Sequence, residues 1–415
     1  MPSATPSPRC RFCAAPLTLS LVDLGVTPLA NSYLAPEHLA RPEPQFPLHA
    51  RVCGSCRLVQ VEAAATPAEI FGHYAYFSSY AASWVEHARR FTEMARERWG
   101  LGSASKVVEV ASNDGYLLRH FVAAGVPVLG VEPAANVAES ARAIGVDTDV
   151  AFFGLETARR LKAAGHAADL VVGNNVFAHV PDLNDFVAGL ACLLKADGVV
   201  SLEFPHLLKL IAEVQFDTIY HEHFSYLSLL TTERILAAHG LRVFDVAELP
   251  THGGSLRVMA CHAASAVHAE GPGLPKVRRD EIAAGLDRDA GYQGFAPRVE
   301  TVRDGLLAFL REARAGGKTV AAYGAAAKGN TLLNYCGVGA DLVACVVDRN
   351  PHKQGCFMPG SRIPILDPSR LVELRPDFVL ILPWNLKDEI TAQMAEVRGW
   401  GGRFVIAVPA LTVLS

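Results

Sequence analysis

Short apolar runs alternate with amphipathic stretches along most of the chain after residue 105. β-Branched and other apolar residues predict strands at 106–110, 128–132, 169–175 and 198–204. Strands that alternate with helices favour an open, mainly parallel sheet with helices on both faces. Two more apolar runs, 241–246 and 255–261, are expected to be the last strands of this sheet.

A second alternating unit follows a polar, charged and helix-prone linker at 262–317. Strands are expected at 318–323, 341–348 and 377–383, with a tight Gly-rich loop at 324–331 and a helix from Leu332 onward. The fold class is therefore α/β, with two Rossmann-like domains. We place the domain boundaries at 1–70, 71–262 and 263–415, where the first domain is small and the last includes the linker.

Composition limits the classes of function. Half of the 415 residues are hydrophobic, the formal net charge is -4, and no block of Lys and Arg appears, so we expect a folded globular protein without a nucleic-acid partner. The N-terminus lacks the apolar core of a signal peptide, and no stretch is long enough to span a bilayer. We therefore expect a cytoplasmic protein that does not bind membranes.

The N-terminal domain carries two Cys-x-x-Cys pairs, Cys10 with Cys13 and Cys53 with Cys56. Four thiolates match the tetrahedral preference of Zn²⁺ and leave no open coordination position, so the metal site should be structural. Chance pairing of buried cysteines is the alternative. The long segment between the pairs contains a turn-rich run, 24–31, that is expected to be an irregular loop.

The densest group of proton-transfer side chains lies in two stretches, 203–206 and 220–226. If the second is extended, Tyr220 and Glu222 share one side of the strand and the two neighbouring histidines share the other. Such a cluster favours acid–base chemistry. A strand with satisfied histidines and a His-x-His metal site are the alternatives.

The loop after the first strand, 111–115, lacks the Gly-x-Gly-x-x-Gly fingerprint, which disfavours a nicotinamide oxidoreductase. It resembles the acidic-x-Gly-x-x-x-Gly loop of class I S-adenosylmethionine-dependent methyltransferases, with Glu109 as the acidic residue, Ala111 in place of the first glycine, and Gly115 last. An alanine fits there if it keeps a negative φ. Glu132 ends the next strand, where such folds bind ribose hydroxyls.

Other positions carry weaker signals. Asn174 and His179 stand where many class I methyltransferases carry an Asn and a His-Val, and this resemblance puts them beside the cofactor and the acceptor. The Gly-rich loop 324–331 places Lys328 before a glycine, so ATP hydrolysis is not supported, although the loop could present a lysine and amides to a diphosphate. A domain used for packing and docking is the alternative. His252, beside two glycines, is either an acceptor contact or a turn histidine.

Together, the Tyr-His-Glu-His-Phe-Ser-Tyr stretch at 220–226 and the Cys-x-x-Cys pairs resemble the deoxysugar C-methyltransferases of antibiotic biosynthesis, which act on nucleotide-activated 4-keto sugars. The resemblance spans the whole chain. It implies that His223 is the base that removes the proton next to the ketone and that Tyr220 steadies the enolate. It implies that Glu222, His179 and Tyr74 orient sugar and base. The cofactor would lie against Glu109, Ala111, Gly115, Glu132 and Asn174, and the candidates for substrate binding are His206, His252, Lys328, Asn330 and Trp384.

We therefore expect a monomeric C-methyltransferase that uses S-adenosylmethionine and a structural Zn²⁺. Its substrate would be a nucleotide-diphosphate sugar, most simply dTDP-linked, held between the middle and C-terminal domains. An O- or N-methyltransferase acting on a sugar or small molecule is one alternative. A zinc-containing scaffold without catalytic activity is the other.

Overall fold

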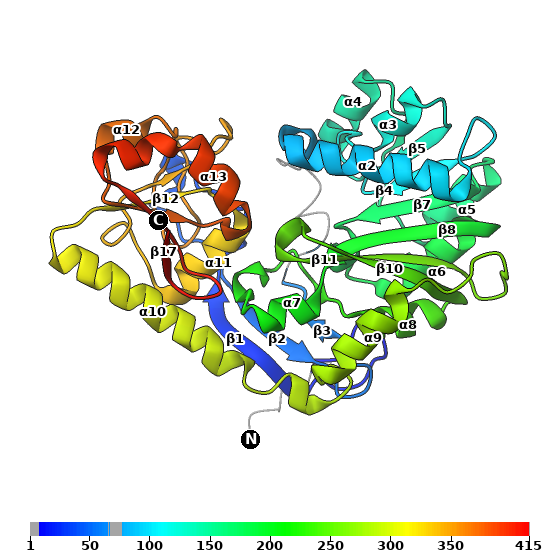
Figure 1. The fold of residues 1–415 in the computed structure, drawn as a ribbon, viewed down its shortest axis with the longest axis horizontal. Helices are drawn as coiled ribbons and strands as arrows, with labels where there is room; N and C mark the ends of the chain where they lie inside the picture. The colour runs from blue at the N-terminus through cyan, green and yellow to red at the C-terminus, as the bar shows by residue number, and fades with distance from the viewer. Residues whose placement is uncertain (1–7, 65, 67–76, 415) are drawn as a thin grey trace.

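Three sheets organise the computed structural model, which describes residues 8–64, 66 and 77–414 (Figure 1). The N-terminal sheet is antiparallel and has the order β1-β2-β3-β9. Its strands are β1 (Leu19–Thr27), β2 (Phe46–Val52), β3 (Val59–Gln60) and β9 (Ser225–Tyr226). Residues 24–27 are thus strand, and the expectation of a loop from residue 24 was wrong there. Since β9 belongs to the 220–226 stretch, that stretch is fastened to the N-terminal sheet.

The central sheet confirms the predicted open architecture. Its order is β10-β11-β8-β7-β4-β5-β6; the strands from β6 to β8 are parallel, and β11 is antiparallel to both of its neighbours. The strands are β4 (Val107–Val110), β5 (Val128–Val131), β6 (Thr148–Asp149), β7 (Ala168–Asn174), β8 (Leu194–Pro205), β10 (Leu241–Leu249) and β11 (Ser255–His262). Strand order reverses at β4, and ligands of open α/β sheets bind at such a crevice.

Helices cover both faces of this sheet because alternate strand residues point to opposite sides. Val107 and Leu170 pack with α2, α3 and α4 in one apolar cluster, whereas Val108 and Val171 pack with α5, α6 and α8 in another. The helices are α2 (Ala82–Trp99), α3 (Leu118–Ala123), α4 (Ala135–Ala143), α5 (Leu155–Ala163), α6 (Leu183–Leu193), α7 (Leu207–Ala212) and α8 (Leu229–Ala237). None of the helices in the described ranges is both long enough and apolar enough to cross a membrane.

The C-terminal sheet has the order β14-β13-β12-β15-β16-β17 and is parallel except for β17. Two predictions were wrong here. The predicted strand 341–348 is reduced to two residues, and the helix α11 begins at Ala327, so Lys328 lies in a helical turn. The elements are α9 (Gly273–Ala283), α10 (Phe295–Ala315), β12 (Val320–Tyr323), α11 (Ala327–Cys336), β13 (Val346–Val347), β14 (Ile365–Leu366), α12 (Arg370–Leu374), β15 (Phe378–Ile381), α13 (Lys387–Gln393), β16 (Arg403–Ile406) and β17 (Thr412–Leu414).

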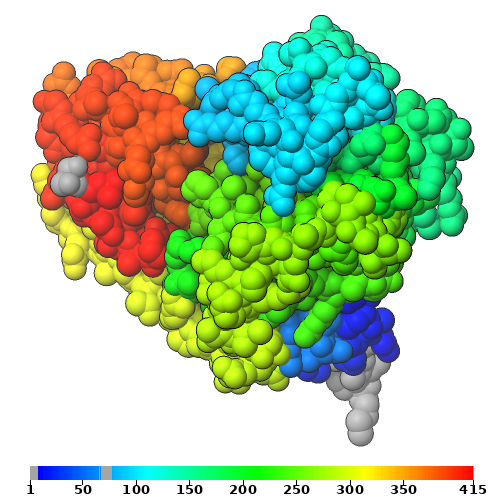
Figure 2. All heavy atoms as spheres, turned by 45° about the vertical axis from the view of Figure 1, so that its right-hand side comes forward, coloured from blue at the N-terminus to red at the C-terminus, as the bar shows by residue number. Residues whose placement is uncertain are grey.

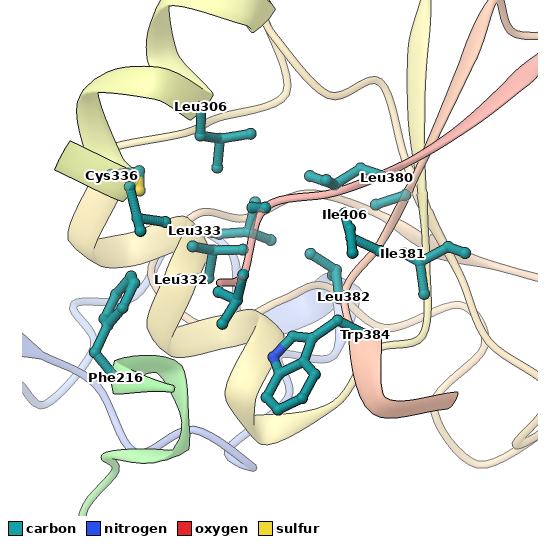
Figure 3. Packing of buried hydrophobic residues seen from close by; sticks show 14 of the residues in the cluster. Phe216, Leu306, Leu332, Leu333, Cys336, Leu380, Ile381, Leu382, Trp384 and Ile406 are labelled. Carbon is teal, nitrogen blue, oxygen red and sulfur yellow. The ribbon is translucent and has the colours of Figure 1, made fainter. Parts of the chain in front are cut away.

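One apolar core joins the N-terminal sheet, the segment after β8 and the C-terminal domain. Figure 3 shows Phe216, from the segment between α7 and α8, beside α11, with Leu332, Leu333 and Trp384 close by. In Figure 2 the N-terminal residues, in blue, reach the surface at the base of the molecule. The domain boundaries at residues 70 and 262 therefore remain a proposal, since packing continues across the first of them.

Candidate active site

A tight turn, and not a strand, brings the central side chains together. The Tyr220–His223 segment is closed by a hydrogen bond from the His223 N–H to the Tyr220 carbonyl, 2.9 Å. The Tyr220 and His223 rings therefore lie against each other, tilted by 32° with centroids 4.0 Å apart, and the Tyr220 hydroxyl lies 2.7 Å from His223 Nε2. The expectation of alternating sides was wrong because residues three apart in a turn come onto the same side.

The surroundings of His223 define which ring nitrogen carries the proton. Nδ1 lies 3.0 Å from the Thr218 carbonyl oxygen. A carbonyl can only accept, so Nδ1 donates, and Nε2 presents its lone pair to the Tyr220 hydroxyl. Burial, with the neighbouring His179, keeps the pKa of His223 well below its ordinary value. The ring is therefore neutral at pH 7 and able to accept a proton at Nε2.

His179 and His252 complete a group of neutral rings. The His179 ring lies 4.6 Å from the His223 ring, and burial lowers the pKa of His179 to about 4. His252 Nε2 lies 2.6 Å from Asn175 Nδ2, and burial lowers its pKa to about 4 as well. Both Asn175 and His252 adopt a left-handed backbone, with φ 53° and 55°, a conformation that costs free energy outside glycine and clusters at functional sites.

The two middle residues of the turn, His221 and Glu222, point to other partners. His221 lies 3.2 Å from the Pro47 carbonyl and is buried against β2, which indicates a structural histidine. The Glu222 carboxylate accepts a 2.6 Å hydrogen bond from Asn31 of the N-terminal domain. Burial raises the pKa of Glu222 to about 7, opposed by the Asn31 hydrogen bond and by Lys353.

Lys328 and Trp384 come from the C-terminal domain and lie beside the segment that precedes the turn. Lys328 Nζ donates to Asn385 Oδ1 at 2.7 Å and lies 4.6 Å from the Trp384 ring centre. The Trp384 indole N–H donates to Asp217, 2.7 Å. Burial lowers the pKa of Lys328 and raises that of Asp217 to about 6. Asn330 is buried on the same helix, and its Oδ1 has no hydrogen-bond partner among the described residues.

The other predicted substrate residues have different surroundings. His206 is fully buried, and its Nε2 lies 2.7 Å from Glu281, which also accepts from the Leu229 N–H at the start of α8. This geometry indicates a structural role for His206. Tyr74 lies outside the described residues.

A network that sequence reasoning missed lies at the end of β8. The fully buried Glu203 carboxylate is bound by His87 of α2, by Arg257 of β11 and by the Thr251 hydroxyl. Burial alone would raise the pKa of Glu203, but these partners outweigh burial and lower it. Thr251 adjoins His252, so Glu203 holds the loop that presents His252. The position of Glu203 at a strand end was a usable signal, whereas nothing local marks His87.

The cofactor loop has the features of a nucleoside site. The Glu132 carboxylate accepts hydrogen bonds from the Asn113 and Ala134 N–H groups, at 3.0 and 2.9 Å. The first of these bonds ties the loop after β4 to the end of β5. Ala111 has φ 55°, so the alanine does not meet the condition of a negative φ and adopts the left-handed conformation. Gly115 has φ 78°, and a Cβ there would lie 3.0 Å from Val146; a side chain is excluded on both grounds.

Buried polar atoms gather around this loop. Glu109 is fully buried, and burial raises its pKa well above the ordinary value. Asn174 donates to the Tyr116 hydroxyl at 3.5 Å, while its Oδ1 has no partner within the described parts of the chain. Glu109, Glu132 and Asn174 place hydrogen-bond acceptors at the carboxyl ends of β4, β5 and β7. Such acceptors suit a positively charged nucleoside cofactor, which offers amino, ribose and adenine groups as donors.

The four paired cysteines converge. Their sulfurs lie within 4.8 Å of one another, and the Cys10–Cys56 and Cys13–Cys53 pairs are each 3.5 Å apart. Four sulfurs at about 2.3 Å from Zn²⁺ would be separated by about 3.8 Å, so the cluster fits the ion. Two turns shape it, in which the N–H groups of Ala14 and Arg57 each bond back to the first cysteine of a pair, 2.9 Å.

The fold and the site define a class I S-adenosylmethionine-dependent methyltransferase with a structural zinc site. Three family models match: one described as a zinc binding domain at 10–71, one as a methyltransferase domain at 73–246, and one as a C-methyltransferase C-terminal domain at 250–409. C-methyltransferase NovU of Streptomyces niveus is 40% identical over 410 residues, which are 99% of this chain and 97% of that protein. The chain belongs to this family of C-methyltransferases.

Several solved methyltransferase structures match part of the chain. The magnesium protoporphyrin IX methyltransferase of Synechocystis PCC 6803 with bound SAM is 16% identical and matches 43% of this chain and 78% of that chain, with a TM-score of 0.32. An S-adenosylmethionine-dependent methyltransferase of Clostridium acetobutylicum ATCC 824 is 10% identical and matches 43% of this chain and 92% of that chain, with a TM-score of 0.35.

Proposed function

We propose that this C-methyltransferase acts on a nucleotide-diphosphate 4-keto-deoxysugar, by removing a proton next to the ketone and methylating the enolate carbon. The observation that carries the proposal is the half-buried Tyr220–His223 pair, with a neutral Nε2 lone pair 2.7 Å from the phenol oxygen. A C–H beside a ketone is a weak acid, so its removal needs a base and a donor for the developing oxygen charge. The pair contains both groups.

In this proposal Tyr220 binds the ketone oxygen, His223 removes the proton and Thr218 stabilises the protonated ring. A ketone oxygen within reach of Tyr220 would accept the hydrogen bond from its hydroxyl, and His223 Nε2 would then be free to take the α proton. The proton passes to Nε2, and the electrons of the C–H bond form the enolate, whose oxygen is stabilised by Tyr220. Cofactor S-adenosylmethionine supplies an electrophilic methyl group to the enolate carbon. The Thr218 carbonyl stabilises the imidazolium, because it accepts from Nδ1.

The sugar and its diphosphate would lie between the middle and C-terminal domains. The half-buried Lys328, on α11, offers positive charge next to Trp384 and Asn385, and the buried Asn330 lies on the same helix. His252 and His179 would contact the sugar, and Tyr74 would join them. The cofactor would contact Glu109, Ala111, Gly115, Glu132 and Asn174. A monomer and a dTDP carrier are part of the same proposal.

The test is incubation with a panel of dTDP-4-keto-6-deoxysugars in deuterated buffer, with and without S-adenosylmethionine, followed by mass spectrometry. We expect deuterium uptake at the α carbon without the cofactor and a carbon-bound methyl group with it. His223→Ala should lose both, while its affinity for the cofactor stays the same. Methylation of a heteroatom without exchange would support an O- or N-methyltransferase, and cofactor binding without any turnover would support the scaffold.

A further inference from the structure

The segment between the two Cys-x-x-Cys pairs leaves the N-terminal sheet and docks on the C-terminal domain. Leu34 pairs with Phe357 through two backbone hydrogen bonds, 3.0 and 2.8 Å. Further along, the Glu43 carboxylate accepts from the Gly360 N–H at 2.8 Å and pairs with Arg362. Zinc ligation needs no such extension, which indicates that the segment has another role.

Asn31 lies in the turn of this segment between β1 and Leu34 and reaches the catalytic motif. Its Nδ2 donates to Glu222 Oε1 at 2.6 Å. Glu222 is only 4% exposed and is the chain neighbour of His223, so its carboxylate needs a partner from within the protein. The side-chain amide of Asn31 donates a hydrogen bond to that carboxylate, although the two residues are 191 positions apart in the sequence.

Asn31 is linked to the C-terminal domain through Tyr33. The Tyr33 hydroxyl lies 3.2 Å from Asn31 Oδ1 and donates to the Ala325 carbonyl at 2.6 Å. Lys353 Nζ donates to the same carbonyl at 2.8 Å and lies 5.0 Å from the Tyr33 ring centre. The N-terminal, middle and C-terminal parts of the protein therefore meet in one series of contacts, which runs from Ala325 through Tyr33 and Asn31 to Glu222.

We propose that Asn31 is a positioning residue for C-methylation: its amide fixes the Glu222 carboxylate, and thereby the orientation of the sugar toward His223. The inference rests on the proposed function and deepens it. It assigns a catalytic purpose to the long segment of the zinc-binding domain. The amide acts through Glu222 and not on the reacting atoms.

The first test compares Asn31→Ala with the wild type on a keto sugar that the wild type methylates. We expect kcat, and the rate of α-proton exchange, to fall about 10- to 100-fold, because a small displacement of a positioned group has effects of this size. The cofactor affinity and the zinc content should not change. In a Glu222→Ala background, which removes the acceptor, Asn31→Ala should have little further effect, since the residues act as a unit.

Glu43→Ala is the matched control. It removes a contact between the same segment and the same C-terminal domain, but Glu43 does not touch Glu222. We expect its kcat to stay within about twofold of the wild type. Equal losses in Glu43→Ala and Asn31→Ala, or additive losses in the double variant, would overturn the proposal in favour of general docking.

A second readout does not depend on activity. The infrared band of the Glu222 carboxyl group can be assigned by its loss in Glu222→Gln, and its titration followed from pH 5 to 9. The charged and titratable groups around this carboxyl are Lys353 and Tyr33. Lys353 in turn pairs with Asp348. Asn31→Ala should move the titration to higher pH, because the lost donor favoured the ionised form. An unchanged titration would refute the role of Asn31, whereas an inactive wild type with a shifted titration would refute only the proposed substrate.

Discussion

His223 shows how a single ring acquires its chemistry from its contacts. The Thr218 carbonyl fixes the tautomer, burial keeps the ring neutral, and the Tyr220 hydroxyl marks where the lone pair points. These residues are close in sequence, so the motif could be recognised from the chain alone. Their arrangement in a turn could not, because Tyr-His-Glu-His contains no residue that excludes a strand.

Tyr220→Phe tests the pair directly. The variant keeps the ring but removes the hydroxyl that would stabilise the enolate oxygen, so we expect kcat to fall about 10²- to 10³-fold. Binding of S-adenosylmethionine, measured by calorimetry, should be unchanged. Tyr335→Phe, which alters a tyrosine that packs against Phe216, is the control and should retain activity. Undiminished α-proton exchange in Tyr220→Phe would contradict the assigned role.

Glu222 makes stability depend on pH. Its pKa is about 7 in the folded protein, against an ordinary value of 4.5, so between these values the folded state holds a proton that the unfolded chain has lost. Stability therefore falls as pH rises from 4.5 to 7, by about 3 kcal/mol in total. Glu222→Gln should flatten this dependence and be more stable than the wild type at pH 8, as measured by chemical unfolding. A wild-type-like pH profile in the variant would show that Glu222 ionises normally.

Loops at the carboxyl ends of the central strands owe their shapes to contacts between elements. The pattern of strand and helix was readable from sequence because burial on both faces makes each parallel strand apolar. The loop conformations were not, since neither the left-handed Ala111 nor the hydrogen bond from the Asn113 N–H to Glu132 follows from a local residue pattern. Likewise, Glu203 acquires its partners from α2 and β11, which lie far away in the chain.

Glu203→Ala should be strongly destabilising. It leaves the buried Arg257 and the half-buried His87 without their common carboxylate, and breaking a buried pair such as Arg257–Glu203 costs about 3–5 kcal/mol. Replacing Glu203 and Arg257 together by methionine should recover much of this loss, since neither charge is then left unpaired. Chemical unfolding of the three proteins measures both effects. A double variant no more stable than Glu203→Ala would indicate that packing and not charge determines the cost.

The N-terminal domain contacts the proposed active site. Its sheet takes β9 from the catalytic stretch, its zinc cluster supports that sheet, and its long segment brings Asn31 to Glu222. The cysteine spacing revealed the metal site because the ligands come in local pairs. Asn31 had no local signal, because its importance arises only from a contact with a residue far along the chain.

Removal of zinc should therefore reduce catalysis as well as stability. We expect a chelator to lower the melting temperature and to expose the N-terminal segment to proteolysis, since the metal replaces a core that so small a domain cannot build. α-Proton exchange should fall in parallel, because β9 loses its partner strand. Release of about one zinc ion per chain, measured with a chromogenic chelator, checks the stoichiometry. Full exchange activity in the metal-free protein would contradict this coupling.

Sequence alone determined the alternation of strands and helices in the central sheet, the four cysteines that cluster and the Tyr220–Tyr226 motif, because each depends on residue types at short, regular spacing. Tertiary structure decided which side chains of the motif meet, that His206 pairs with Glu281, and that Asn31 reaches Glu222. These contacts join residues far apart in the chain. Packing of three domains around a common core sets such contacts, and no local pattern encodes them.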